Sequence, residues 1–300
     1  MKKIGLLLGM FFLLASNVMA SNWKAGHVVM IAFDGWGAYS VPKAEIPNIR
    51  QLMSEGCYTL KKRSVLPSSS AINWASMFNG AGTEIHGYTE WNSQTPEIPS
   101  RVVNKHGVFP TIYSLLDEQC PLAETGCLAE WEGIKYLIDS LAVDYWGLSV
   151  NYEEQPQRLC EMAEEYIKSK KPIFVSICFD QLDHVGHADG HDTPSYYNKL
   201  NELDAYVGRI IKVLKEIGIY DDTVIIVTAD HGGINKGHGG KTLQEMEVPF
   251  IISGKNIRSG GEFKESMMQF DTAATIAYAL GLKQPQVWIG RPMVQVFENK

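Results

Sequence analysis

The chain has 300 residues, of which 45% are hydrophobic and 20% are charged, with 27 glycines, 13 prolines and a net charge of −7. This composition is that of a folded globular protein and excludes a disordered, collagen-like or coiled-coil chain. An acidic chain is not attracted to polyanions, so neither a nucleic acid duplex nor an anionic membrane surface is an expected partner.

Residues 1–20 have the pattern of a secretory signal peptide. Lys2 and Lys3 precede an apolar run over residues 4–15, and a small-residue cleavage pattern ends at Ala20. The apolar run is too short to cross a hydrocarbon core of ~30 Å, so we expect no stable membrane insertion. We therefore expect export across the inner membrane, to the periplasm, and a single domain over residues 21–300.

Short apolar runs alternate with segments of helical period in the rest of the chain. In chain order, residues 27–33, 172–179, 223–228 and 248–253 predict strands, and residues 47–54, 155–170, 195–217 and 271–280 predict helices. Fully apolar strands separated by helices are typical of an α/β fold, a mostly parallel sheet sandwiched by helices. Residues 93–170 are less regular and predict a small inserted lobe, a cap-like insertion over one edge of the sheet.

The chain has five cysteines, too few for a disulfide scaffold and odd in number: Cys57, Cys120, Cys127, Cys160 and Cys178. Cys120 and Cys127 flank a loop and could close a small ring. Cys57 and Cys178 lie in apolar runs and are expected to be buried thiols. The sequence leaves the pairing open.

Acids and histidines follow three of the predicted strands: Asp34 after the first, Asp183 and His187 after the second, and Asp230, His231 and then His238 after the third. Because the carboxyl ends of parallel strands meet at one edge of a sheet, we expect these side chains to converge. Alone, Asp34 could form a turn with Gly35, and the acids near Asp183 could be a solvated loop. Together, three carboxylates and three imidazoles suit one or two ions of the zinc class, whereas calcium or magnesium would favour oxygen ligands.

These segments resemble the metal ligands of the alkaline phosphatase superfamily, especially its type I phosphodiesterase and nucleotide pyrophosphatase branch. The similar segments are Phe33-Asp34-Gly35, Asp183-x-x-Gly186-His187, Asp230-His231-Gly232 and His238-Gly239. The family's nucleophile segment, Pro-x-x-Thr/Ser-x-x-Asn, is similar to Pro67 to Asn73 and implies Ser70 as the nucleophile. A further family motif resembles Gly80 to Asn92 and implies Asn92 as a donor to a phosphate oxygen.

The resemblance implies an alkaline phosphatase-like catalytic domain with two Zn²⁺ per chain. One ion would be held by Asp183, His187 and His238, and the other by Asp34, Asp230 and His231, with the Ser70 hydroxyl as the remaining ligand. A nearby dication stabilises a serine alkoxide without a histidine base. Ser70 would then attack phosphorus, and water would hydrolyse the resulting phosphoserine.

Differences between this sequence and the motifs of related families restrict the class of ester that we expect it to cleave. Sulfatases of the superfamily carry Cys/Ser-x-Pro-x-Arg, and the segment from Ser70 to Trp74 lacks both the Pro and the Arg. Certain phosphomonoesterases add a Lys-x-Arg pair, which does not occur between Asn92 and Asp180, although Arg101 or another cation could fold back. This favours small-molecule phosphate diesters or nucleotide pyrophosphates as substrates.

Nearby aromatic side chains, which could contact a diester's organic group or belong to the core, are Tyr88, Trp91, Tyr145 and Trp146. Two alternatives stay open. One is an alkaline-phosphatase-like phosphomonoesterase, and the other is a non-catalytic metal- or glycan-binding periplasmic protein. The oligomeric state is unknown from the sequence.

Overall fold

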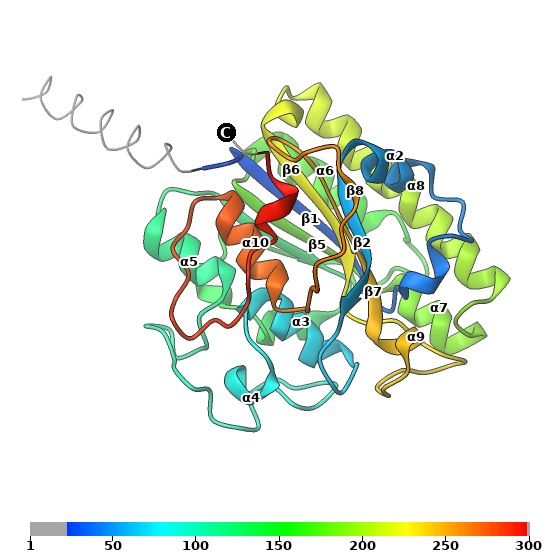
Figure 1. Cartoon of the computed structure of the whole chain (residues 1–300), viewed down its shortest axis with the longest axis horizontal. Helices are drawn as coiled ribbons and strands as arrows, with labels where there is room; N and C mark the ends of the chain where they lie inside the picture. Colours follow the sequence, from blue (N-terminus) through cyan, green and yellow to red (C-terminus); the bar gives the residue numbers. More distant parts are fainter. Residues whose placement is uncertain (1–22, 299–300) are drawn as a thin grey trace, which may run out of the picture.

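The computed structural model describes residues 23–298, so the predicted signal peptide lies outside the described residues. Its centre is a twisted sheet of eight strands (Figure 1). In spatial order the strands are β4 (Tyr145–Leu148), β3 (Thr125–Ala129), β5 (Phe174–Phe179), β1 (His27–Phe33), β6 (Thr223–Ala229), β7 (Glu247–Gly254), β2 (Cys57–Arg63) and β8 (Gly261–Glu262). β7 runs antiparallel to β6 and β2, and the other neighbouring strands pair in parallel.

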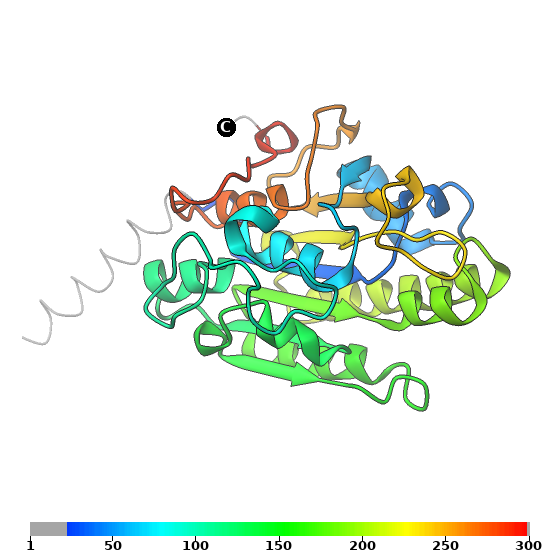
Figure 2. The same ribbon diagram turned by 90° about the horizontal axis from the view of Figure 1, so that it is seen from below.

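Helices cover both faces of the sheet (Figure 2). One face carries α3 (Ser70–Asn79), α5 (Ile112–Gln119) and α10 (Asp271–Ala279), and the other carries α2 (Pro47–Glu55), α6 (Arg158–Lys170) and α8 (Pro194–Glu216). Three shorter helices are α4 (Thr83–His86), α7 (Gln181–Asp189) and α9 (Leu243–Met246). Short 3-10 helices occur at Ala38–Ser40, Glu132–Tyr136, Ser140–Ala142, Tyr220–Asp222 and Val294–Val296. This arrangement confirms the predicted α/β class, and the predicted strands and helices end within a few residues of the observed ones.

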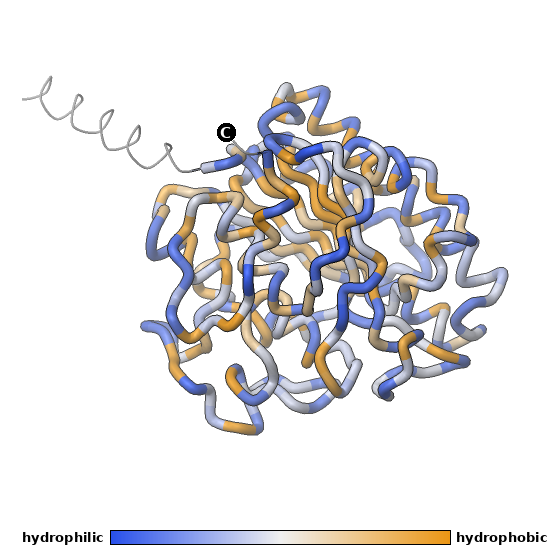
Figure 3. Tube along the Cα trace, in the orientation of Figure 1, coloured by the Kyte–Doolittle hydropathy of each residue, from blue (hydrophilic) through white to orange (hydrophobic). Residues whose placement is uncertain are grey.

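The core has two halves, one on each face of the sheet. Successive side chains of a strand point to opposite faces, so Val28 and Met30 of β1 enter one half while Val29 and Ile31 enter the other. Figure 3 shows that the central strands are almost continuously hydrophobic, as expected for strands covered on both faces.

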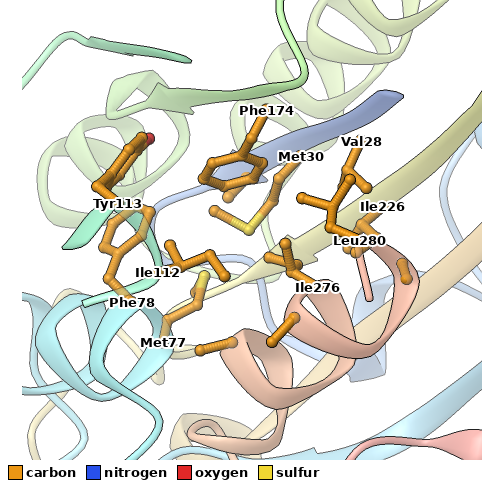
Figure 4. Close-up of a cluster of buried hydrophobic side chains, with 14 of the residues drawn as sticks. Val28, Met30, Met77, Phe78, Ile112, Tyr113, Phe174, Ile226, Ile276 and Leu280 are labelled. Carbon is orange, nitrogen blue, oxygen red and sulfur yellow. The ribbon is translucent and has the colours of Figure 1, made fainter. Parts of the chain in front are cut away.

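In the half drawn in Figure 4, side chains of β1, β5 and β6 meet those of α3, α5 and α10. Phe78 of α3 packs against Tyr113 of α5, which in turn contacts Phe174 of β5. The helix that begins at Ser70 is therefore fixed to the centre of the sheet by its buried face.

Residues 93–170 differ from the expected lobe. β3 and β4 extend the sheet beyond β5, while α5 and α6 cover its two faces. The sequence does not predict these two strands because both are short and each contains a glycine, Gly126 in β3 and Gly147 in β4. The longest stretch without a helix or strand here is residues 87–111, which form loops next to α4 (Figure 1).

All five cysteines are free thiols, so Cys120 and Cys127 do not close a ring in this structure. Cys57 and Cys178 are buried, as predicted. No helix within residues 23–298 is long and apolar enough to span a membrane.

Candidate active site

The three central strands end at the same level. Phe33, the last residue of β1, is in register with the last residues of both β5 and β6. Asp34, Asp180 and Asp230 are the next residues along the three strands. Three carboxylates therefore lie side by side at the carboxyl ends of the central strands.

Asp183, His187 and His238 form a first group at these strand ends. α7 starts directly after β5 and carries Asp183 and His187 one helical turn apart, with Nε2 of His187 3.2 Å from Oδ2 of Asp183. The loop after β6 brings in His238, whose Nε2 lies 3.1 Å from Nε2 of His187 and 3.8 Å from the same Asp183 oxygen. The structure thus brings together the three residues predicted to hold one ion.

Asp34, Asp230 and His231 form a second group. Nε2 of His231 lies 3.3 Å from Oδ1 of Asp34 and 3.4 Å from Oδ2 of Asp230. The Ser70 hydroxyl joins this group, because its Oγ lies 3.1 Å from His231 Nε2 and 3.4 Å from Asp34 Oδ1. The two groups are continuous, since the rings of His231 and His238 stack with their centroids 3.8 Å apart.

The three histidines are oriented in the same way. Each has Nδ1 within hydrogen-bonding distance of a backbone carbonyl: 2.8 Å for His231 with Gly232, 3.0 Å for His187 with Lys236 and 3.1 Å for His238 with Ser68. A carbonyl can only accept, so each Nδ1 carries the proton and the lone pair of the neutral ring is on Nε2. The three Nε2 atoms face the carboxylates, which is the orientation that metal-ligating histidines adopt.

The carboxylates repel one another in a buried site. Burial, followed by the charge of Asp230, raises the pKa of Asp34, and burial, followed by the charge of Asp183, raises the pKa of Asp230. Burial acts on Asp183 in the same direction, but the interactions with the imidazoles of His187 and His191 outweigh it and keep the pKa of Asp183 below the ordinary value. We call the two groups together the cluster. A cation bound in the cluster would offset the repulsion and favour the charged form of Asp34, Asp183 and Asp230.

The imidazoles differ in their protonation. Burial lowers the pKa of His231 to about 3, and it also lowers the pKa of His238. Both rings are thus neutral at pH 7, the form that binds a metal. The hydrogen bond with Asp183 instead raises the pKa of His187 to about 9, so an ion must displace a proton there.

The donor set fits divalent ions of the zinc class. Oδ1 of Asp183 and Oδ2 of Asp230 are buried without a hydrogen-bond partner among residues 23–298. A buried carboxylate oxygen without a donor or a cation is unfavourable. Mixed imidazole and carboxylate ligands are typical of zinc.

Asn73 shapes the turn that presents Ser70. Ser69 is the N-cap of α3 and Ser70 is its first residue. The Asn73 side chain accepts a hydrogen bond from the backbone N–H of Val65 at 2.7 Å and donates to the carbonyls of Pro67 and Ser69 at 3.2 and 3.0 Å. Its amide is fully used within the protein, so Asn73 is not free to bind a substrate.

Asn92 is exposed, outside the buried cluster. Its neighbour Trp91 accepts a hydrogen bond from the backbone N–H of Ala71 at 3.1 Å, which holds this loop against the first turn of α3. Asn92 is therefore next to the turn that carries Ser70. Trp91 itself is 62% exposed.

The other aromatic candidates are structural. Tyr88 is buried and its hydroxyl donates to the carbonyl of Tyr136 at 2.8 Å. Tyr145 and Trp146 lie in the edge strand β4, where Tyr145 stacks on Tyr166. They start a parallel strand, whereas the cluster lies where the strands end, so of the two alternatives left open for them the structure favours packing in the fold.

Two residues next to the cluster were not predicted. The indole Nε1 of Trp74 donates to Oδ2 of Asp34 at 2.9 Å. The ring of His191 is fully buried, with Nε2 3.6 Å from Oδ1 of Asp183. Trp74 follows Ser70 by one helical turn, a spacing that could have indicated it, whereas His191 resembles its neighbours in an acidic loop.

Comparison with known proteins agrees with this geometry. A family model described as type I phosphodiesterase / nucleotide pyrophosphatase matches residues 28–241, a range that contains both groups and Ser70. The bis(5'-adenosyl)-triphosphatase enpp4 of Mus musculus is 25% identical over 71% of this chain. The chain spans about half the length of that relative, with 48% of it covered.

Two further proteins are similar over different extents. The catalytic subunit of GPI ethanolamine phosphate transferase 2 of Homo sapiens is 34% identical over 40% of this chain and 13% of its own length. The structure of an inactive murine ectonucleotide pyrophosphatase / phosphodiesterase 5 in complex with AMP superposes with a TM-score of 0.70 at 16% identity, covering 90% of this chain and 98% of that one. At this identity the superposition establishes the shared fold.

Proposed function

Since the chain belongs to the type I phosphodiesterase/nucleotide pyrophosphatase family, we propose that it hydrolyses phosphate diesters or nucleotide pyrophosphates with Ser70 as the nucleophile and two zinc ions as cofactors. The single observation that carries this proposal is the position of the Ser70 hydroxyl. Its Oγ is within 3.4 Å of ligand atoms from both Asp34 and His231. A hydroxyl beside a buried donor set of this kind is placed to act as a nucleophile.

Each proposed ion has its own set of side chains. Asp183, His187 and His238 would hold one, and Asp34, Asp230 and His231 would hold the other with the Ser70 oxygen. A bound dication lowers the pKa of a neighbouring hydroxyl and stabilises negative charge on phosphate oxygens. The protein supplies the orientation, because backbone carbonyls fix each imidazole with Nε2 toward the cluster.

The proposed reaction has two displacements at phosphorus. Ser70 Oγ passes its proton to solvent and bonds to phosphorus, while the ester bond to the leaving group breaks and the leaving oxygen takes the electron pair. Water then attacks the same phosphorus and gives up a proton to solvent, and the bond to Ser70 Oγ breaks, with that oxygen taking the electron pair and regaining a proton. The positive end of the α3 dipole, at Ser70, would stabilise the phosphate oxygens during both steps, with Asn92 as a further donor.

Two of the cations that could neutralise a monoester dianion pair with acidic side chains instead. Lys105 pairs with Asp117 at 2.5 Å, and Arg158 pairs with Glu161 at 3.6 Å. A diester carries one negative charge and a second organic group, so it needs fewer cations and more apolar contact. The exposed indole of Trp91 offers such contact beside Ser70, which favours a diester over a monoester.

One zinc-loaded preparation tests the proposal against its alternatives. We expect kcat/KM to be higher for an aryl phosphodiester or a nucleotide pyrophosphate than for the matching monoester and for a sulfate ester. A tenfold preference for the monoester, about 1.4 kcal/mol in transition-state binding, would assign an alkaline-phosphatase-like phosphomonoesterase instead. Zinc binding without any hydrolysis would assign a non-catalytic binding protein.

We also propose export to the periplasm, on the pattern of residues 1–20. Mass measurement of the mature protein tests this proposal. A chain that begins at residue 21 is the expected result, and an intact residue 1 would contradict it.

A further inference from the structure

Trp74 binds the Asp34 carboxylate through the oxygen that does not contact Ser70. Its indole Nε1 donates to Oδ2 of Asp34 at 2.9 Å, while Oδ1 of the same carboxylate faces Ser70 Oγ at 3.4 Å and His231 Nε2 at 3.3 Å. Both Trp74 and Asp34 are almost completely buried. The two oxygens of Asp34 therefore have different partners.

One helix supplies both contacts to this carboxylate. Ser70 is the first residue of α3 and Trp74 lies one helical turn later, so the two side chains lie on the same face. The Trp74 ring stacks on Phe78 a further turn along, with the ring centroids 6.1 Å apart. Since α3 is fixed in the core, the indole N–H has a defined position against Asp34.

The partner of this indole is unlike those of two other tryptophans. Trp36 donates to the hydroxyl of Ser40, and Trp288 donates to the carbonyl of Pro110. Both acceptors are neutral oxygens, whereas Trp74 donates to a buried carboxylate. Hydrogen bonds to ionised acceptors are about twice as strong as those between neutral groups.

We propose that Trp74 is a positioning residue for the ion held by Asp34. Its N–H fixes the rotation of the carboxylate so that Oδ1 alone points toward the ion and Ser70. This inference rests on the proposed function, because it concerns one of the two proposed ions. It predicts that loss of the N–H weakens one zinc site and leaves the other site, built from Asp183, His187 and His238, unchanged.

Calorimetric titration of the metal-free protein with Zn²⁺ tests this inference. Trp74→Phe removes the N–H and keeps an aromatic ring, and we expect the affinity for one of the two ions to fall about 10- to 100-fold, the usual cost of losing a partner behind a ligand. Trp288→Phe is the matched control, because it removes a buried indole hydrogen bond of the same length, 2.9 Å, outside the site. A purely structural role of Trp74 would weaken both sites or neither.

A second variant covers the case in which Trp74→Phe does not fold. Replacement of Trp74 by 3-benzothienylalanine keeps the bicyclic shape and substitutes sulfur for N–H, so no cavity is created. Selective weakening of one site in either variant supports the proposal. Two unchanged affinities overturn it while leaving the proposed function intact, whereas a wild-type protein that binds no zinc overturns both.

Discussion

Oγ of Ser70 and Nε2 of His231 lie 3.1 Å apart although 161 positions separate the two residues in the chain. Ser70 is placed by the first turn of α3, and His231 is placed by the end of β6. Nδ1–H of His231 donates a hydrogen bond to the carbonyl of Gly232, so the lone pair on Nε2 faces the serine. This contact joins the proposed nucleophile to the proposed metal site.

Ser70→Ala should abolish nearly all turnover while the protein keeps its fold and most of its metal affinity. The attacking oxygen is lost, but all the carboxylates and imidazoles of the cluster remain. Activity assays together with metal analysis of the same preparation check this result.

Ser69→Ala is the matched control for Ser70→Ala, because Ser69 is adjacent but serves as the N-cap of α3 and its side chain makes no capping hydrogen bond. We expect this variant to retain most of its activity. An inactive Ser69→Ala protein beside an active Ser70→Ala protein would move the nucleophile by one residue.

Asn92→Ala and Asn73→Ala should have different effects. Asn92 is exposed, so its loss should leave the melting temperature unchanged and lower kcat by up to about 10²–10³, the usual cost of losing one oxyanion donor. Asn73 is buried and bonded to the backbone before α3, so its loss should lower the melting temperature. Melting curves and kcat of both variants distinguish a donor to the substrate from a structural residue. An unaffected kcat in Asn92→Ala would exclude Asn92 as a donor to a phosphate oxygen.

Zinc binding should release protons at neutral pH. The hydrogen bond with Asp183 raises the pKa of His187 to about 9 in the metal-free protein, above the ordinary ~6.5, so His187 is charged there and must lose its proton to bind an ion. The apparent zinc affinity should therefore rise with pH up to about 9. In the metal-free protein the His187 contact stabilises the fold fully below the unfolded pKa, and this contribution is lost as the pH rises through about 9.

Calorimetry at pH 7.5 in buffers of different ionisation enthalpy measures this proton release. Metal analysis after dialysis should give two zinc ions per chain, with chelators inactivating the enzyme. We expect His187→Asn to release about one proton fewer than the wild type. Equal proton release by the two proteins would show that His187 is not charged before the ion binds.

Trp91→Ala should lower kcat/KM for a bis-aryl phosphodiester by about tenfold, since contact with an aromatic ring contributes ~0.5–1.5 kcal/mol beyond area burial. A diester with small alkyl groups should be affected much less, because it cannot reach the indole. Leu122→Ala is the control, as Leu122 is 88% exposed and has no part in the site. The same loss for both diesters would exclude a role of Trp91 in substrate preference.

The sequence predicted the central strands and the cluster because both depend on local patterns. β1 is apolar from Val28 to Phe33 and is followed directly by Asp34, so its burial and its chemistry are visible together. β2 was missed because its residues Lys61, Lys62 and Arg63 look like a solvated segment, although Lys62 is fully buried and donates to Thr228 at 2.8 Å.

Contacts that depend on tertiary structure could not be predicted in this way. Tyr145 lies in the region expected to form a lobe over one edge of the sheet, which suggested a place near the site. In the structure it is the first residue of β4, an outermost strand, whereas the site lies where the central strands end. Trp74 lies one helical turn after Ser70, but its partner Asp34 is 40 positions away in the chain. Their contact therefore depends on the tertiary structure. His191 meets Asp183 only because the chain turns back after α7.

The stereochemical course at phosphorus tests the central claim, a covalent intermediate on Ser70, most directly. A chiral phosphorothioate diester is hydrolysed in ¹⁸O-labelled water, and the configuration of the product is determined. Two successive in-line displacements, the first by Ser70 and the second by water, predict net retention of configuration. Net inversion would show that water attacks the substrate directly, and would contradict the account.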